Sequence, residues 1–338
     1  MRTFVALLAL IAVLAFGGPD AALAQAAGKK DVVIRFGNQP GIATASIVKH
    51  FGWLEKQGYT VKWINFNDAG SEMRALAAGE IDIMLAGAAP EMVLSSKYAG
   101  SWFVAGPLTN GNQLIVPVDS PIKTVKDLKG KRIAYPGPGS QQYALIATAL
   151  HAEGMKPEDV NLYKSVAPDM LSLMQRKEID GFMAWTPFTS EAVRTGAGRV
   201  LLSAQDVFAK VGGKGEWISE GYVASRDFAT KHPDALVDCI TAVARAAQMI
   251  RTRQAEAVAA LSAETGLAKE TINFAIDKKF AVFPPSIVPT ADTVQSMVEI
   301  FAQAGLIEGV NVPDFVRSLN HPEFAQKAEA MLARETKQ

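Results

Sequence analysis

Glu80-Ile81-Asp82 returns 98 residues later as Glu178-Ile179-Asp180. Three other pairs of landmarks recur at this offset or within one residue of it: Pro40-Gly41 and Pro138-Gly139, Glu55 and Glu153, and Pro90 and Pro187. Around each copy the sequence alternates between apolar strand patterns, Gly/Pro turns and helix patterns. The repeat therefore predicts two similar α/β lobes, and a cleft between two facing lobes is a natural place for a ligand.

Strand and helix patterns follow one another through short connections, which is typical of mostly parallel sheets with right-handed crossovers. The expected strands are residues 32–36, 60–66, 81–86, 102–105, 114–116, 132–135, 161–166, 181–185, 200–203 and 221–224. The expected helices between them are residues 43–57, 71–78, 90–96, 124–128, 140–153 and 169–176. The predicted fold class is thus α/β, with two lobes that are each a mostly parallel sheet flanked by helices.

The chain beyond Pro233 has helical apolar spacing almost to its end. It predicts helices over residues 235–250, 255–265, 269–280, 291–303 and 322–334. We expect this helical C-terminal segment to pack on the first lobe, whereas the Gly- and Lys-rich residues 206–219 predict a loop. Lobe 1 is then residues 27–116 and 222–338, lobe 2 is residues 117–221, and the crossings near 116–118 and 221–224 form a hinge.

The N-terminus has the pattern of a secretory signal peptide. A short basic start, Met1-Arg2-Thr3, precedes an apolar run over residues 4–16, and Ala22-Leu23-Ala24 offers a small-x-small cleavage site. The apolar run is too short to span a bilayer. Residues 1–24 therefore predict export, most simply to a bacterial periplasm.

Charge and composition exclude several functions. The chain has 34 basic and 34 acidic residues, and the predicted signal peptide removes one of each, Arg2 and Asp20, so a nucleic-acid partner is not expected. The four histidines are far apart, the lone Cys239 lies in an apolar helical pattern, and no metal site or cofactor is predicted. No G-x-S-x-G elbow occurs. The loop from Gly137 to Gln142 has Gln142 where a dinucleotide loop has its third glycine.

Four turns at expected strand ends offer helix N-termini, whose free N–H groups and dipoles attract anions. The turns are residues 41–44, 68–71, 87–90 and 137–142, and their candidate ligand residues include Ser71, Ala88, Ala89, Ser140, Gln141 and Gln142. In doubly wound sheets such turns lie at the carboxyl ends of the strands, where ligands bind. Any one of them could merely shape a turn, but four on facing lobes predict a site.

Two further segments carry side chains suited to a cleft. Trp185 and Thr186 close the second Glu-Ile-Asp strand, where an indole can form a cleft wall. Glu220 precedes the return crossover, with Tyr222 two residues later. Because a buried Glu needs a partner, a cleft position for Glu220 favours a ligand with a cationic or hydrogen-donating group; a solvated loop carboxylate is the alternative.

These motifs together resemble a known family. The motifs are a strand followed by Gly-x-Gln39-Pro, residues 73–82, the turn 87–90, residues 127–134, Glu178-Ile179-Asp180-Gly181 with Trp185-x-Pro187, and Arg226-Asp227-Phe228 before His232-Pro233. In this order they are similar to periplasmic binding proteins for taurine, aliphatic sulfonates and nitrate. The resemblance implies a two-lobed type II periplasmic binding fold, a monomer that closes on a small anionic or zwitterionic ligand and delivers it to an ABC permease and ATPase complex.

Carried over to this sequence, the resemblance implies a ligand site. Its residues are Gln39, Ser71, Ala88, Ala89, Ser140, Gln141, Gln142, Tyr143, Trp185, Thr186, Glu220 and Tyr222. The sequence departs from the pattern where Ala88 and Ala89 replace hydroxyl residues and where Gln141-Gln142 replaces smaller ones. Taurine or another sulfonate is the leading ligand; an aromatic carboxylate, nitrate or a pyrimidine precursor of thiamine remains an alternative. An enzyme resembling pyrimidine synthases and an exported sensor are competing functions.

Overall fold

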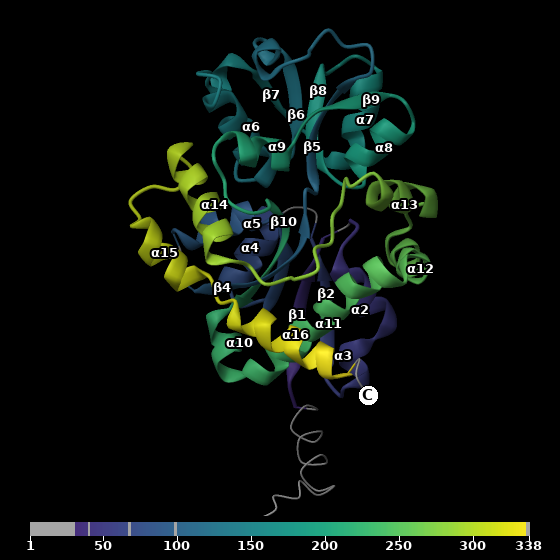
Figure 1. The fold of residues 1–338 in the computed structure, drawn as a ribbon, viewed down its shortest axis with the longest axis vertical. Helices are drawn as coiled ribbons and strands as arrows, with labels where there is room; N and C mark the ends of the chain where they lie inside the picture. Colours follow the sequence, from purple (N-terminus) through teal and green to yellow (C-terminus); the bar gives the residue numbers. More distant parts are fainter. Residues whose placement is uncertain (1–30, 40, 67–68, 98–99, 336–338) are drawn as a thin grey trace, which may run out of the picture.

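The computed structural model describes residues 31–39, 41–66, 69–97 and 100–335, so the expected signal peptide lies outside the described residues. Two five-stranded sheets form the two lobes, one above the other in Figure 1. The first sheet has the order β2-β1-β3-β10-β4 and consists of β1 (Val33–Asn38), β2 (Thr60–Asn65), β3 (Ile83–Ala86), β4 (Ser101–Thr109) and β10 (Ile218–Ser225). The second has the order β7-β6-β8-β5-β9 and consists of β5 (Asn112–Pro117), β6 (Arg132–Tyr135), β7 (Asn161–Lys164), β8 (Gly181–Trp185) and β9 (Gly198–Ser203).

The two sheets are built alike. In each, one strand, β10 or β5, is antiparallel to both of its neighbours, while β1 and β6 pair in parallel with the strands beside them. The predicted α/β class with two mostly parallel sheets is therefore confirmed. The helices of the two repeats are α2 (Thr44–Phe51), α3 (Trp53–Lys56), α4 (Ala69–Ala77) and α5 (Ala88–Ser95), then α6 (Gln141–His151), α7 (Ala167–Gln175), α8 (Phe188–Arg194) and α9 (Ala204–Lys210).

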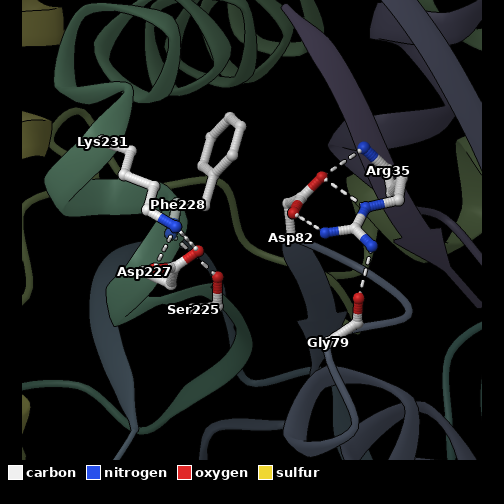
Figure 2. A network of polar contacts seen from close by, with 7 residues as sticks. All are labelled: Arg35, Gly79, Asp82, Ser225, Asp227, Phe228 and Lys231. Atoms are coloured by element: carbon white, nitrogen blue, oxygen red, sulfur yellow. Dashed lines mark hydrogen bonds and ion pairs between the residues drawn. The ribbon is translucent and has the colours of Figure 1, made fainter.

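An Arg–Asp contact marks the repeat in both lobes. Asp82 accepts hydrogen bonds from the backbone N–H of Arg35 at 2.8 Å and from its Nε at 3.0 Å, and the guanidinium also donates to the carbonyl of Gly79 (Figure 2). Asp180 accepts the same two bonds from Arg132, at 2.8 and 3.1 Å. The Glu-Ile-Asp motif therefore recurs because its aspartate ties the first strand of each repeat to the third.

The chain passes between the sheets at Asn110 and Gly111, which join β4 to β5, and returns between β9 and β10. Both connections precede the expected crossings at residues 116–118 and 221–224, because β5 already pairs with β8 and β9, and β10 with β3 and β4. Sheet membership thus assigns β5 to lobe 2 and β10 to lobe 1. Hinge motion about these connections stays a prediction.

The C-terminal helices pack mainly on the first lobe. They are α10 (Arg226–Lys231), α11 (Pro233–Thr252), α12 (Gln254–Thr265), α13 (Lys269–Asp277), α14 (Ala291–Gln303), α15 (Val312–Leu319) and α16 (Glu323–Glu335). Helices α11 and α12 contact α2, and α15 and α16 contact β4, whereas α13 reaches α8 and α14 reaches α6 of the second lobe. In Figure 1, α14–α15 and α12–α13 flank the junction on opposite sides. None of the described helices is long and apolar enough to cross a bilayer.

The structure corrects several local predictions. Residues 206–219 are not one loop, because Ser203 and Asp206 form a capping box that starts α9, and β10 already begins at Ile218. Helix 43–57 is split at Gly52, which has φ +57°. Helices α4 and α5 each begin two residues earlier than expected, so Ser71 lies inside the first turn of α4.

Candidate functional site

A cavity of about 730 Å³ lies between the lobes, lined by residues of both. All four predicted turns contribute to it: residues 41–43 before α2, 69–70 at the start of α4, Gly87 before α5, and 137–142 at the start of α6. Each turn follows the carboxyl end of a strand, where ligands bind in such sheets, and the turns of the two lobes line the same cavity. The N-termini of four helices therefore surround one space, as the sequence predicted.

Apolar side chains form much of the cavity wall. Ile42, Met73, Leu85, Leu94, Leu108, Val166 and Trp185 all line it. Trp185 ends β8 of the second lobe and reaches Gly41 of the first, where a Cβ would lie 3.7 Å from the indole Nε1. Phe188 packs edge-on against the indole, with ring centroids 5.5 Å apart. The predicted wall position of Trp185 is thus where the structure places it, at the seam of the two lobes.

Glu220 is the one acidic residue among the described cavity-lining residues. Its Oε1 accepts a hydrogen bond from Thr44 Oγ1 at 2.6 Å, and the Thr44 hydroxyl lies 2.7 Å from the hydroxyl of Tyr222. Burial, at 8% exposure, raises the pKa of Glu220 to about 7, and hydrogen bonds with Thr44 and Tyr222 oppose this rise. No described cation is among the partners of this carboxyl group, which lines the cavity. The carboxyl group can therefore accept a hydrogen bond from a ligand.

The second lobe has Asn112 at the position equivalent to Glu220. Gly221 of β10 pairs with Ala86, and Gln113 of β5 pairs with Ala184. Because Ala86 and Ala184 are 98 residues apart, Gly221 corresponds to Gln113 in the repeat. The residues before them, Glu220 and Asn112, therefore correspond as well. Asn112 Oδ1 accepts a hydrogen bond from Gln141 Nε2, much as Glu220 accepts one from Thr44. The repeat therefore offers an acid from one lobe and an amide from the other.

Gln141 also crosses between the lobes. Its Oε1 lies 2.5 Å from where a Cβ would stand on Gly87. Any larger residue at position 87 would displace this side chain, because real Cβ contacts are longer. Gln141 thus lies against both lobes, with its amide already bonded to Asn112.

Gln142 faces the cavity next to Gln141. Its side chain is only 5% exposed, and no described residue forms a hydrogen bond with the side-chain amide. Ser140 caps α6 by accepting from the N–H of Tyr143 at 3.1 Å. A buried amide beside a helix N-terminus is suited to hydrogen-bond an anionic ligand group.

Gln39 follows β1 and is held by a buried glutamate. Its Nε2 donates to Glu72 at 2.6 Å, and Glu72 also accepts the backbone N–H of Leu85 at 3.0 Å. Gly37 leaves the space for this carboxylate, since a Cβ there would lie 2.4 Å from Glu72 Oε1. The Gly-x-Gln motif is explained by this contact, in which Glu72 orients Gln39 at the cavity.

The structure brings seven of the twelve predicted site residues into the cavity lining: Gln39, Ser140, Gln141, Gln142, Trp185, Thr186 and Glu220. Four predicted residues lie outside it. Ser71 is in the first turn of α4, Ala88 is fully buried, Tyr143 packs on Tyr135, and Tyr222 is buried behind Glu220. Ala89 belongs to α5, and its contribution stays a prediction.

Sequence reasoning missed four polar residues of the described cavity lining, Arg74, Asn112, Lys164 and Ser219, and it had Thr44 only as the last residue of the turn 41–44. Thr44 and Asn112 follow from the repeat, because they lie at a helix start and a strand position that have counterparts in the other lobe. Arg74 lies in the quoted motif 73–82. No group of three or more His, Cys, Asp or Glu side chains suited to a metal ion occurs in the described part of the chain.

Comparisons with known proteins agree with this architecture. A model of the NMT1-like family matches residues 25–264. The taurine-binding periplasmic protein of Escherichia coli K12 is 32% identical over 187 residues, which are 54% of this chain and 55% of that protein, so the match spans about half of that relative. A second E. coli K12 protein, provisionally named as an aliphatic sulfonates-binding protein, is 26% identical over 78% of this chain and 80% of its own.

Solved structures extend the likeness to the whole fold. The crystal structure of the periplasmic aliphatic sulphonate binding protein of E. coli superposes with a TM-score of 0.70 at 24% identity. It covers 86% of this chain and 92% of that one. At this identity the likeness shows a shared two-lobed fold and carries no statement about the ligand.

Proposed function

The chain belongs to the NMT1-like family, and on that premise we propose that it is a periplasmic solute-binding protein that captures a small organic anion, a sulfonate such as taurine first, and delivers it to an ABC importer. The observation that carries the proposal is the polarity of the cavity. A carboxyl acceptor, Glu220, comes from the first lobe, and buried amides, Gln142 and Asn112, come from the second. A ligand with an anionic group and a hydrogen-donating group meets both.

The anionic group is placed at the start of α6. Backbone N–H groups in the first turn of a helix and the positive end of its dipole favour a sulfonate or carboxylate there. Ser140, the cap of α6, and Gln142 both line the cavity at this end. The names of the two E. coli relatives, for taurine and for aliphatic sulfonates, support the same ligand class.

The hydrogen-donating group is placed at Glu220. Thr44 and Tyr222 hydrogen-bond this carboxyl from the protein side, and its exposure to the cavity lets it also accept from an ammonium or N–H group of the ligand. Because burial disfavours the ionised carboxyl, an ammonium ligand both binds it and favours its ionisation. This arrangement supports an amino sulfonate over a plain alkanesulfonate.

Ligand binding to both lobes would shift an open–closed equilibrium, which the importer reads. Trp185 is suited to this role because it reaches Gly41 across the seam of the lobes. Nitrate, aromatic carboxylates and pyrimidines stay alternative ligands, since amides and helix N-termini bind them as well. A sensing role would use the same closure without transport.

A thermal-shift screen of the mature protein tests the proposal. Taurine, alkyl and aryl sulfonates, nitrate, aromatic carboxylates and pyrimidines are compared. A ligand at 100 times its Kd adds about 2.7 kcal/mol to the free energy of unfolding and raises Tm. We expect taurine or another sulfonate to raise Tm. A rise only with carboxylates or heterocycles would mean that the ligand is one of these compounds and not a sulfonate. No rise with any compound would contradict the proposal.

Two variants connect the screen to the cavity. Trp185→Ala should weaken ligand binding at least tenfold, because it removes the indole that forms part of the cavity wall between the lobes. The circular dichroism spectrum of the variant should match that of the wild type, which shows that the fold is retained. Trp63→Ala is the matched control, since Trp63 lies in β2 and does not line the cavity. Equal loss of binding in both variants would mean a general effect on folding.

A further inference from the structure

Among the described residues, three charged side chains line the cavity, and two of them are cations that the proposed ligand does not use. Arg74 comes from α4 of the first lobe and Lys164 from the end of β7 in the second. Both are exposed, whereas Glu220 and Gln142 are buried. The cations therefore stand at the solvent side of the cavity, one on each lobe.

Arg74 lies on the face of α4 that lines the cavity. Ala69, Gly70 and Met73 of the same helix also line it, which places Arg74 on one continuous stripe with them. Arg74 forms no ion pair with any other described residue, while Arg35, Arg132 and Arg194 each pair with a carboxylate. An arginine without a partner on a cavity wall is available to a ligand.

In the other lobe, the side chain of Lys164 packs against a glycine of the loop before α6. Its side chain lies across Gly137, where a Cβ would stand 3.3 Å from Lys164 Cε, and Gly137 has φ +136°. Gly137 belongs to the loop that opens α6, so the absence of a side chain there lets Lys164 lie along the loop that leads to Ser140. Within the described chain, Lys164 has no carboxylate partner either.

Glu220 is not the partner of these cations. The shift of its pKa is caused by burial and by hydrogen bonds with Thr44 and Tyr222, and no described cation is among the causes. Glu220 is also buried, whereas Arg74 and Lys164 are exposed, so the acid and the two cations occupy separate parts of the cavity. Its volume of about 730 Å³ is also in the range of roughly 300–1,000 Å³ typical of sites for drug-sized ligands, and far more than a two-carbon sulfonate fills.

We propose that Arg74 and Lys164 form a second anion subsite, so that the sulfonates this cavity takes include organic dianions whose two charged groups are joined by an apolar spacer. This inference rests on the proposed function and extends it. One anionic group lies at the start of α6, the spacer contacts Met73 and Val166, and the second group bridges Arg74 and Lys164. Because each lobe supplies one cation, the second group also favours closure.

Isothermal titration of the mature protein with 1-propanesulfonate and 1,3-propanedisulfonate tests the subsite. We expect the disulfonate to bind at least about tenfold more tightly at low salt, since charge-assisted hydrogen bonds to Arg and Lys are among the stronger polar contacts. The difference should shrink at high salt, because both cations are exposed.

The double variant Arg74→Gln/Lys164→Gln should bind the two sulfonates equally. Lys62→Gln/Lys156→Gln is the control of equal charge, since both lysines are exposed and outside the cavity lining, and it should keep the preference. Equal binding by the wild type would overturn the subsite. So would an equal loss of both sulfonates in the cavity double variant, because the cations would then hold the first anionic group.

Failure of the proposed function gives a different result. If neither sulfonate binds, the sulfonate assignment fails, and dicarboxylates and monocarboxylates of matched length then test the subsite alone. A preference for the dicarboxylate that the cavity double variant removes would retain the subsite with another ligand head group. Absence of that preference would overturn it.

Discussion

The two lobes share their scaffold contacts and differ where they face the cavity. Arg35–Asp82 in the first lobe and Arg132–Asp180 in the second make the same hydrogen bonds between equivalent strands. At the cavity, the corresponding positions carry Glu220 in one lobe and Asn112 in the other. Contacts that hold each sheet together are thus repeated, and contacts that face a ligand are not.

Even the shared contact differs in its surroundings. The Asp82 side chain is 5% exposed, whereas that of Asp180 is 31% exposed. Gly79, in the turn between α4 and Asp82, has φ +71°, and the corresponding residue before Asp180 is Lys177 with φ +62°. The Arg–Asp contact should therefore contribute more to stability in the first lobe than in the second. This difference, and the presence of Glu220 in the first lobe alone, can be tested by mutation.

The largest effect is expected for Asp82→Ala. Removing this buried carboxylate leaves the Arg35 N–H and guanidinium without their acceptor, which costs about 3 kcal/mol in the free energy of unfolding. Urea denaturation followed by circular dichroism measures it. A loss below about 1 kcal/mol would show that burial does not distinguish the two contacts.

Glu220 should make the first lobe sensitive to pH. Its pKa rises to about 7 in the folded protein, so the folded state holds this proton more tightly than the unfolded state. The resulting stability is present below about pH 4.5 and is lost as pH rises toward 7, by roughly 2–3 kcal/mol. The difference in unfolding free energy between wild type and Glu220→Gln, measured from pH 4.5 to 8, isolates the contribution; a difference constant with pH would contradict it.

Asp180→Ala should cost less than the change in the first lobe. The contact is partly exposed, so we expect a loss of about 1 kcal/mol. Hydrogen bonds from Arg132 lower the pKa of Asp180, so its contribution is present near neutral pH and is lost as pH falls below the ordinary range of aspartate. Equal losses from Asp82→Ala and Asp180→Ala would remove the contrast between the lobes.

The smallest effect is expected at the left-handed residue before each aspartate. Lys177→Gly should stabilise the protein by about 0.5 kcal/mol, because glycine relieves the strain of a positive φ at some cost in unfolded-state entropy. Gly79→Lys should destabilise it by about 1 kcal/mol, since open space surrounds Gly79 and only backbone strain opposes the change. Thermal unfolding of both variants checks the opposite signs.

Much of the fold could be predicted from the sequence, because equivalent elements of the two lobes lie 98 residues apart in the chain. The 98-residue offset matches α4 and α7 at both ends, 69 with 167 and 77 with 175. The strand connections were placed wrongly because Asn112 and Gln113 are polar and do not look like a buried strand. Their burial depends on hydrogen bonds with Gln141 and Thr189, which join residues far apart in the sequence.

The same limit applies to the site. Turns at strand ends identified the cavity, and Glu220 and Trp185 line it as their positions suggested. Ser71 lies outside the cavity lining because α4 begins two residues earlier than expected, and Tyr222 lies outside it because it is buried behind Glu220. The position of Lys164 at the cavity could not be predicted from the sequence, because its contact with Gly137 depends on how the end of β7 lies beside the loop before α6.

The most direct test of the difference between the lobes is calorimetric titration of wild type and Glu220→Gln with taurine and ethanesulfonate, which differ in one amino group. The account predicts that the wild type binds taurine at least tenfold more tightly and that Glu220→Gln binds the two about equally, while still binding ethanesulfonate. A preference for taurine that survives in Glu220→Gln, or no preference in the wild type, would contradict the assignment of the acidic first lobe to the donor end of the ligand.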